Sequence, residues 1–262
     1  MQPELLDDYY LNLMDWGKNN VIAVALHQNV YLWHSLDGHI DELMKLDGSD
    51  DYVTSVQWSK DKDNVLAVGT ASNTVQLWDA SSLSKVRDLT GHSSRVSSLS
   101  WNGSVVCSGS RDSSILHHDP RIASNVTATY TNHDQEVCGL TWSPDGTTLA
   151  SGGNENRLCI WDAAMSGGGG SRNSSSASTA ATSRYQPRFV IEQHTAAVKA
   201  LAWCPWQRHS LASGGGTADR TIRVWNASTG ACLKCVDTGS QVYVGIHYRF
   251  STTTLHSILV RI

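Results

Sequence analysis

The sequence predicts an all-β protein built from repeated antiparallel sheets, and three observations support this fold class. The stretch 133–162 contains three short runs rich in β-branched and aromatic residues, each too short for a stable helix. Turn formers separate the runs, as in Ser143-Pro144-Asp145-Gly146, where Pro presets φ and Gly accepts a positive φ. The same arrangement recurs along the chain, which predicts a β-propeller or a part of one.

Tryptophans mark this repeat in two parallel series. The first series lies at the end of the first strand of each unit, at Trp16, Trp58, Trp101, Trp142 and Trp203. The second series lies near the end of the third strand, at Trp33, Trp78, Trp161 and Trp225, with His118 where a further Trp is due. A period of about 40 to 45 residues is typical of the WD40 repeat, in which one unit forms one four-stranded blade. We therefore expect a WD40 β-propeller with about five recognisable blades.

The repeat also divides the chain. We expect a lead-in segment over 1–11, propeller blades over 12–242 and a divergent tail over 243–262. The fourth unit is longer than the others because it holds a Gly/Ser-rich tract over 166–183. This tract has no apolar periodicity, so we expect a disordered loop on the rim.

Composition excludes several function classes. The net charge is −4 without a basic block, which disfavours nucleic acid or an anionic membrane as the main partner and suits a cationic peptide. No apolar run has membrane-spanning length, and the N-terminus lacks the features of a signal peptide. All six cysteines sit in strand patterns, as free thiols do in a reducing compartment, so we expect an intracellular protein.

Several His, Asp and Trp residues recur at fixed places in the units. In blades of this kind a His before the first strand and an Asp in a later turn hydrogen-bond toward the Trp. We therefore predict a structural blade network that includes His92, Asp112, His133, Trp161, His194, Asp219 and Trp225.

The sequence offers little support for catalysis, a metal or a cofactor. Cys232 and Cys235 form a single CxxC, which is weak evidence for zinc without a second pair. The segment 117–119, reading His-His-Asp, aligns with an ordinary strand end of the preceding unit. No nucleophile elbow, P-loop or H-E-x-x-H motif occurs. Recognition through loops on a rigid scaffold remains as the predicted activity.

Candidate recognition residues are polar side chains near turns. Asp8 and Asp15 flank the first strand, and Asn154 and Thr217 occupy corresponding turns of the fourth and fifth units. Turn chemistry alone also explains these residue types, because Asp and Asn are common in turns.

Several segments resemble the Fizzy family, whose members are WD40 co-activators of the anaphase-promoting complex, a ubiquitin ligase. The similar segments are DYYLNLMDW at 8–16, SGSRD at 108–112, QEVCGL at 135–140, SGGN at 151–154 and HTAAVKALAWCPWQ at 194–207. The match continues through TGACL at 229–233 and DTGSQV at 237–242, and the start looks like that of plant members.

The resemblance implies a non-enzymatic substrate receptor without a cofactor. Family members bind the Arg-x-x-Leu destruction motif and the Lys-Glu-Asn motif on a seven-bladed ring and promote ubiquitin transfer. By resemblance, Asp8 lies near the arginine of the destruction motif, and Asp15, Asn154 and Thr217 lie on the face that receives the Lys-Glu-Asn motif. Implied partners are the anaphase-promoting complex, degron-bearing cell-cycle substrates and spindle-checkpoint proteins. The implied location is nucleus and cytoplasm.

The sequence also departs from the family. The family has an N-terminal extension, two further blades and a C-terminal Ile-Arg tail, whereas the match here stops after Val242 and the chain ends in Arg261-Ile262. Glu155 stands where the family usually has Asp. We therefore expect a chain truncated at both ends that forms an open five-blade arc with exposed sheet edges, prone to aggregate. A general WD40 scaffold and an inactive truncated paralogue are the alternative functions.

Overall fold

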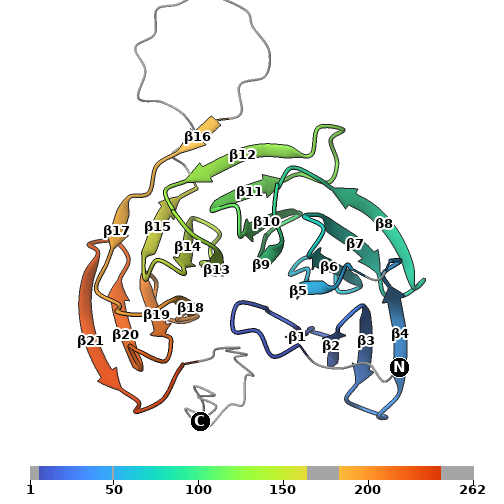
Figure 1. Ribbon diagram of the computed structural model, residues 1–262, viewed down its shortest axis with the longest axis horizontal. Coiled ribbons are helices and arrows are strands. Elements are labelled where there is room, and N and C mark those ends of the chain that lie inside the picture. The colour runs from blue at the N-terminus through green and yellow to red at the C-terminus, as the bar shows by residue number, and fades with distance from the viewer. Residues whose placement is uncertain (1–5, 49, 164–182, 243–262) are drawn as a thin grey trace, which may run out of the picture.

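The computed structural model describes residues 6–48, 50–163 and 183–242, and its strands form five sheets. The predicted all-β architecture with five blades is confirmed, and Figure 1 shows the sheets arranged side by side in an arc around a common centre. The predictions for the insert over 166–183, apart from Ser183, and for the tail over 243–262 lie outside the described residues.

Each sheet is one blade whose strands follow one another outward from the centre (Figure 1). Blade 1 contains β1 (Met14–Trp16), β2 (Val21–Leu26), β3 (Asn29–His34) and β4 (Ile40–Lys45). Blade 2 contains β5 (Val53–Trp58), β6 (Val65–Thr70), β7 (Val75–Asp79) and β8 (Ser84–Leu89). Blade 3 contains β9 (Val96–Asn102), β10 (Val105–Ser110), β11 (Ser114–His118) and β12 (Val126–Thr131). Blade 4 contains β13 (Val137–Trp142), β14 (Thr148–Gly153), β15 (Leu158–Asp162) and β17 (Phe189–Ile191). Blade 5 contains β18 (Val198–Trp203), β19 (Ser210–Gly215), β20 (Thr221–Asn226) and β21 (Ala231–Asp237).

Blade 3 differs from the prediction because it has a fifth strand. β16 (Ser183–Tyr185) pairs in parallel with the outer strand β12, although it lies between two strands of blade 4 in the sequence. The ring of Tyr185 stacks on that of Tyr130, with 4.6 Å between ring centroids. This segment therefore covers the outer edge of blade 3 before the chain returns to blade 4.

The hydrophobic core lies between consecutive blades. Four clusters of buried residues each draw members from two neighbouring blades. Trp142 and Trp203, from the first tryptophan series, are only 2% and 6% exposed, and each packs in a cluster that includes the preceding blade. Because each blade buries its apolar face on the next one, a single sheet has no core of its own.

A glycine in the second strand of a blade makes this packing close. A side chain at Gly152 would overlap the carbonyl oxygen of Val198, the first residue of the next inner strand. Three further second-strand glycines in the described residues lie against a later valine. A side chain at Gly69 would overlap the carbonyl oxygen of Val96, and side chains at Gly109 and Gly214 would overlap the side chains of Val137 and Val242. Blades 2 to 5 therefore each have a niche that accepts a later valine.

Candidate functional site

One face of the arc is built from equivalent positions in successive blades. A turn after the second strand donates its backbone amide to the residue that precedes the inner strand. The pairs are Ala71 to Tyr52, Arg111 to Arg95, Asn154 to Glu136 and Gly216 to Ala197, with N···O distances of 2.9–3.0 Å. These hydrogen bonds align the four turns around the centre of the arc, where their side chains form one surface.

An N-terminal strap, residues 8–12, crosses this surface near the centre. The backbone amide of Asn12 donates to the carbonyl of Thr54 in blade 2, and its side-chain amide donates to the carbonyls of Ser97 and Cys138 in blades 3 and 4. The strap is therefore held by the inner strands of three blades.

Blade 5 also holds the strap. Lys199 donates to the carbonyl of Leu11 at 2.7 Å, and the Tyr9 hydroxyl donates to the carbonyl of Ala197 at 3.2 Å. Burial lowers the pKa of Lys199 to about 8. The sequence indicated only a lead-in segment here, because single residues that contact distant blades leave no periodic pattern.

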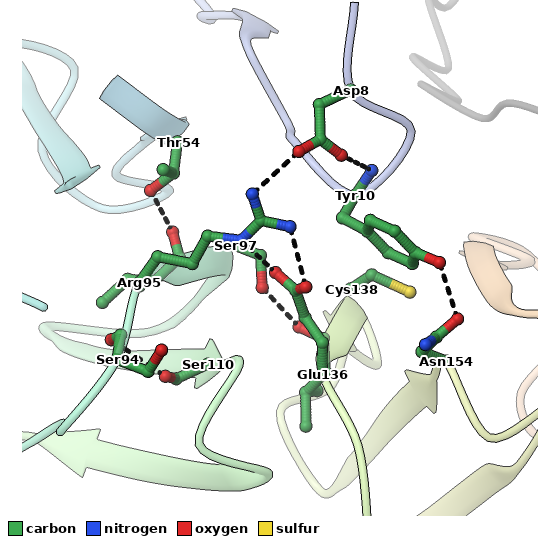
Figure 2. Close-up of polar contacts among 12 residues, drawn as sticks. Asp8, Tyr10, Thr54, Ser94, Arg95, Ser97, Ser110, Glu136, Cys138 and Asn154 are labelled. Atoms are coloured by element: carbon green, nitrogen blue, oxygen red, sulfur yellow. Dashed lines mark hydrogen bonds and ion pairs between the residues drawn. The ribbon is translucent and has the colours of Figure 1, made fainter. Parts of the chain in front are cut away.

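Arg95 is the central charged residue of the face. Its Nε and Nη2 donate to the two carboxylate oxygens of Glu136 at 2.7 and 2.8 Å, and its Nη1 donates to Asp8 at 2.7 Å (Figure 2). The Arg95 and Glu136 side chains are 12% and 7% exposed, whereas that of Asp8 is 31% exposed. Burial by itself lowers the pKa of Arg95, but its hydrogen bonds to Glu136, Tyr52 and Asp8 raise that pKa above the usual range.

A second set of polar contacts lies beside this ion cluster. The Tyr10 hydroxyl donates to Oδ1 of Asn154 at 2.7 Å, and the amide nitrogen of Asn154 donates to Gln135 at 2.6 Å (Figure 2 shows the Tyr10 contact). Burial and the neighbouring carboxylates raise the pKa of Tyr10, so its hydroxyl stays protonated at neutral pH. Asn154 is therefore oriented by the strap.

These groups line a hollow of about 490 Å³. Its lining residues are Asp8, Tyr10, Arg95, Arg111, Gln135, Glu136 and Asn154. The lining holds two carboxylates, two guanidinium groups and two primary amides, so charges of both signs lie close together. Such a surface can bind a peptide that carries a cation, an anion and an amide.

The predicted recognition residues do not all lie together. Asp8 and Asn154 line the hollow, and Thr217 lies in the corresponding turn of blade 5, where its hydroxyl donates to Gln241 at 2.6 Å. Asp15 instead accepts a hydrogen bond from the backbone amide of Trp58, the last residue of β5, at 2.7 Å.

Asp15 does not line the hollow that holds Asn154; it lines a separate central hollow together with Asn12 and Cys138. β5 starts beside Tyr52, whose hydroxyl reaches Arg95, and it ends at Trp58, beside Asp15. A six-residue strand spans about 20 Å, so these two ends lie on opposite faces of the arc. Asp15 joins the inner strands of blades 1 and 2.

The predicted blade network is present in blade 5. Trp225 donates from its indole to the Ser213 hydroxyl at 2.7 Å, and Ser213 lies 2.6 Å from Nε2 of His194. Asp219 accepts from Nδ1 of His194. Because Nδ1 carries this proton, Nε2 of the neutral ring accepts from Ser213. Burial lowers the pKa of His194, which favours the neutral ring.

Blades 3 and 4 vary this network. In blade 4, Trp161, Ser151 and His133 form the same chain, and Glu155 takes the place of Asp219. In blade 3, Asp112, His92 and Ser108 form the corresponding chain, and Ser108 lies 2.7 Å from Nε2 of His118. Nδ1 of His118 donates to Oδ1 of Asn125. The sequence pattern missed the three serines, which align at one position of the second strands.

Arg95, Glu136 and Tyr10 were also missed by sequence reasoning. A usable signal exists, because Tyr52, Arg95, Glu136 and Ala197 each directly precede the first valine of an inner strand. Opposite charges at this position in consecutive units would have indicated an ion pair between blades.

Other kinds of site have no geometric support in the described residues. No group of three His, Cys, Asp or Glu side chains there is arranged to hold a metal ion. Within the same ranges, no helix is long and apolar enough to cross a membrane.

Comparisons with known proteins show which family this chain is similar to. The CDC20/Fizzy WD40 domain matches residues 2–257. The anaphase-promoting complex subunit cdc20 of Dictyostelium discoideum is 52% identical over 92% of this chain and 45% of its own length. Cell division cycle 20.1, cofactor of APC complex, of Arabidopsis thaliana is 49% identical over 92% of this chain and 50% of its own length.

A solved structure agrees with these relatives. A chain in the crystal structure of a mitotic checkpoint complex is 47% identical, with a TM-score of 0.81 over 92% of this chain and 67% of its own length. The chain spans about half the length of the curated relatives that it matches. Because the family match covers nearly all of its residues, the chain belongs to the CDC20/Fizzy WD40 family.

Proposed function

We propose that the chain recognises degron peptides as part of a substrate-recognition co-activator of the anaphase-promoting complex, a role without catalysis of its own. The observation that carries this proposal is the hollow lined by Asp8, Arg95, Glu136, Arg111 and Asn154. The relatives of the chain support the same function, since their names describe a subunit or cofactor of the anaphase-promoting complex.

The charges of the hollow suit a short peptide of mixed charge. The partly exposed carboxylate of Asp8 can accept from a lysine or arginine of the peptide, because each of its oxygens accepts one hydrogen bond here, from Arg95 or from the Tyr10 amide, and has a second lone pair. Exposed Arg111 can pair with a glutamate. Asn154 can exchange hydrogen bonds with a side-chain amide once the Tyr10 hydroxyl moves away.

These chemistries match the Lys-Glu-Asn motif, and Asp8 also suits the arginine of an Arg-x-x-Leu motif. Thr217 extends the same face into blade 5 and supplies a hydroxyl beside the strap. Spindle-checkpoint proteins and cell-cycle substrates are the partner classes that this function implies, with action in the nucleus and cytoplasm.

The test is a fluorescence-anisotropy titration of the chain with a labelled Lys-Glu-Asn peptide and its Ala-Ala-Ala counterpart. We expect Arg111→Gln and Asn154→Ala each to lower the affinity for the Lys-Glu-Asn peptide about tenfold, since each removes a hydrogen-bonding partner. Asn19→Ala is the matched control, because Asn19 is an exposed amide in a turn on the opposite face. Equal binding of both peptides would instead support a scaffold without degron specificity.

Contact with the ligase needs a separate measurement. Immobilised chain is incubated with purified anaphase-promoting complex, with and without the Lys-Glu-Asn peptide. Retention of the complex supports the co-activator role. Peptide binding without retention assigns degron recognition alone to this part of the protein.

A further inference from the structure

A second hollow, of about 300 Å³, lies between blades 4 and 5 on the face opposite the candidate site. β13 begins after Glu136 and ends at Trp142, directly before the turn that lines this second hollow. We call it the turn groove. It lies between two turns, 143–148 and 203–209.

Tryptophan and proline rings form the apolar part of the turn groove. Pro144 and Pro205 are exposed on neighbouring turns, and the Trp206 side chain is 69% exposed beside them. Trp203 forms the floor and is 6% exposed, with its indole donating to the carbonyl of Thr141. An exposed Trp beside proline rings in a hollow is typical of a protein interaction site.

The turn from blade 4 is fixed before any ligand binds. Asp145 accepts from the Ser143 hydroxyl at 2.6 Å and from the Thr147 amide at 3.1 Å, while Gly146 has a φ of 68°. The hydrogen bond from Ser143 lowers the pKa of Asp145 to about 2. Little loop ordering is therefore needed on binding.

Several backbone carbonyls of both turns already accept hydrogen bonds within the protein. The carbonyls of Ser143 and Thr148 accept from backbone amides in blade 4, and those of Gln207 and Ser210 do so in blade 5. Backbone N–H groups of a ligand that face these four carbonyls would find them already bonded. Proline has no backbone N–H and a preset φ, so a proline-containing segment avoids this cost.

Arg208 adds a charge at the rim. Its side chain is 68% exposed, and its Nε lies 3.0 Å from a carboxylate oxygen of Asp145 in an ion pair. Arg95 shows that one guanidinium in this protein can bind two carboxylates through different nitrogens. Arg208 can likewise use its terminal nitrogens for a carboxylate of a ligand while Asp145 fixes its orientation.

We propose that the turn groove binds an extended partner peptide in which proline packs against Trp206 and an adjacent acidic residue pairs with Arg208. Because the groove and the candidate site lie on opposite faces, both can be occupied at once. The chain could therefore bind the partner in the turn groove while a degron peptide occupies the candidate site.

The test uses the full chain labelled with 5-fluorotryptophan and observed by ¹⁹F NMR, with the Trp206 signal assigned from Trp206→Phe. The probe is a synthetic Gly/Ser peptide with two prolines flanked by glutamates. Two variant peptides replace the prolines by glycine or the glutamates by glutamine. We expect the probe to shift the Trp206 signal and the glycine variant not to do so.

Variants of the protein separate the two contacts. Trp206→Ala should weaken the probe at least about tenfold without lowering the Tm, because the side chain is largely exposed. Arg208→Gln should lower the affinity for the glutamate-containing probe to the affinity that the unchanged protein has for the glutamine variant. Arg121→Gln is the matched control, since Arg121 is also 68% exposed and paired with an aspartate.

The proposal is overturned if the probe fails to bind at millimolar concentration, if Trp206→Ala binds it equally, or if the glycine variant binds as well as the probe. A response of Arg121→Gln equal to that of Arg208→Gln would show a nonspecific charge effect and reject the acidic contact. Asn154→Ala should leave probe binding unchanged, so the failure of degron recognition and the failure of this site are distinguishable.

Discussion

Replacing Ser213 by alanine tests the hydrogen-bond chain that joins the strands of blade 5. The hydroxyl accepts from the Trp225 indole and donates to Nε2 of His194, and these residues are 0% and 4% exposed. Alanine has nearly the same volume, so the change leaves two buried polar atoms without partners and opens no large cavity. Each such atom costs about 1–3 kcal/mol, so we expect the free energy of unfolding to fall by about 2–6 kcal/mol.

Two measurements check this prediction. Urea denaturation followed by tryptophan fluorescence gives the change in unfolding free energy, and a chain of this size should lose about 2–4 °C of Tm for each kcal/mol. Exchange of the Trp225 indole proton, followed by NMR, reports the local opening of blade 5.

Controls make the result interpretable. Ser151→Ala should behave in the same way, because Ser151 joins Trp161 to His133 in blade 4. Ser82→Ala should change stability by less than about 0.5 kcal/mol, since Ser82 lies in an exposed turn. A loss below about 0.5 kcal/mol for both Ser213→Ala and Ser151→Ala would refute the reasoning.

Three further predictions follow from the packing and charges. Burial lowers the pKa of His118 to about 4 against about 6.5 in the unfolded chain, so the unfolded state binds more protons between these values. The free energy of unfolding should therefore fall by up to about 1.4 kcal/mol per unit as the pH drops from 6.5 to 4, and urea titrations of His118→Asn should show a smaller slope. Gly152→Ala should cost more than about 2 kcal/mol, measured by urea denaturation, because a Cβ would overlap the carbonyl of Val198; an unchanged midpoint would contradict this contact. Glu136→Ala should cost about 3 kcal/mol because it removes one carboxylate from the buried Arg95, and a double-mutant cycle with Asp8→Asn should show coupling; strict additivity would count against the cluster.

The repeat made most of the fold predictable. Tryptophans at fixed spacing and intervening turns predicted the five sheets, and His118 was expected to take the place of a tryptophan, where it indeed contacts Ser108. β16 could not be predicted, because three residues carry no periodic pattern and their pairing depends on the stacking of Tyr185 on Tyr130.

The candidate site was predicted only in part. Asp8 and Asn154 were named from turns and resemblance, and the structure brings both to one hollow. Asp15 does not line this hollow, and resemblance alone gives a residue without its depth along the strand. Arg95 and Glu136 lie 41 positions apart in the chain, and only the packing of two blades brings them together.

The glycine niches have a consequence for the order in which the protein forms on the ribosome. The niche of Gly152 is filled only when Val198 has emerged, well after the strands of blade 4 have been made. Every blade with such a niche therefore waits for the opening residues of its successor before its packing is complete. During synthesis the most recent blade should therefore expose apolar surface that chaperones can bind, while the earlier blades have already buried theirs.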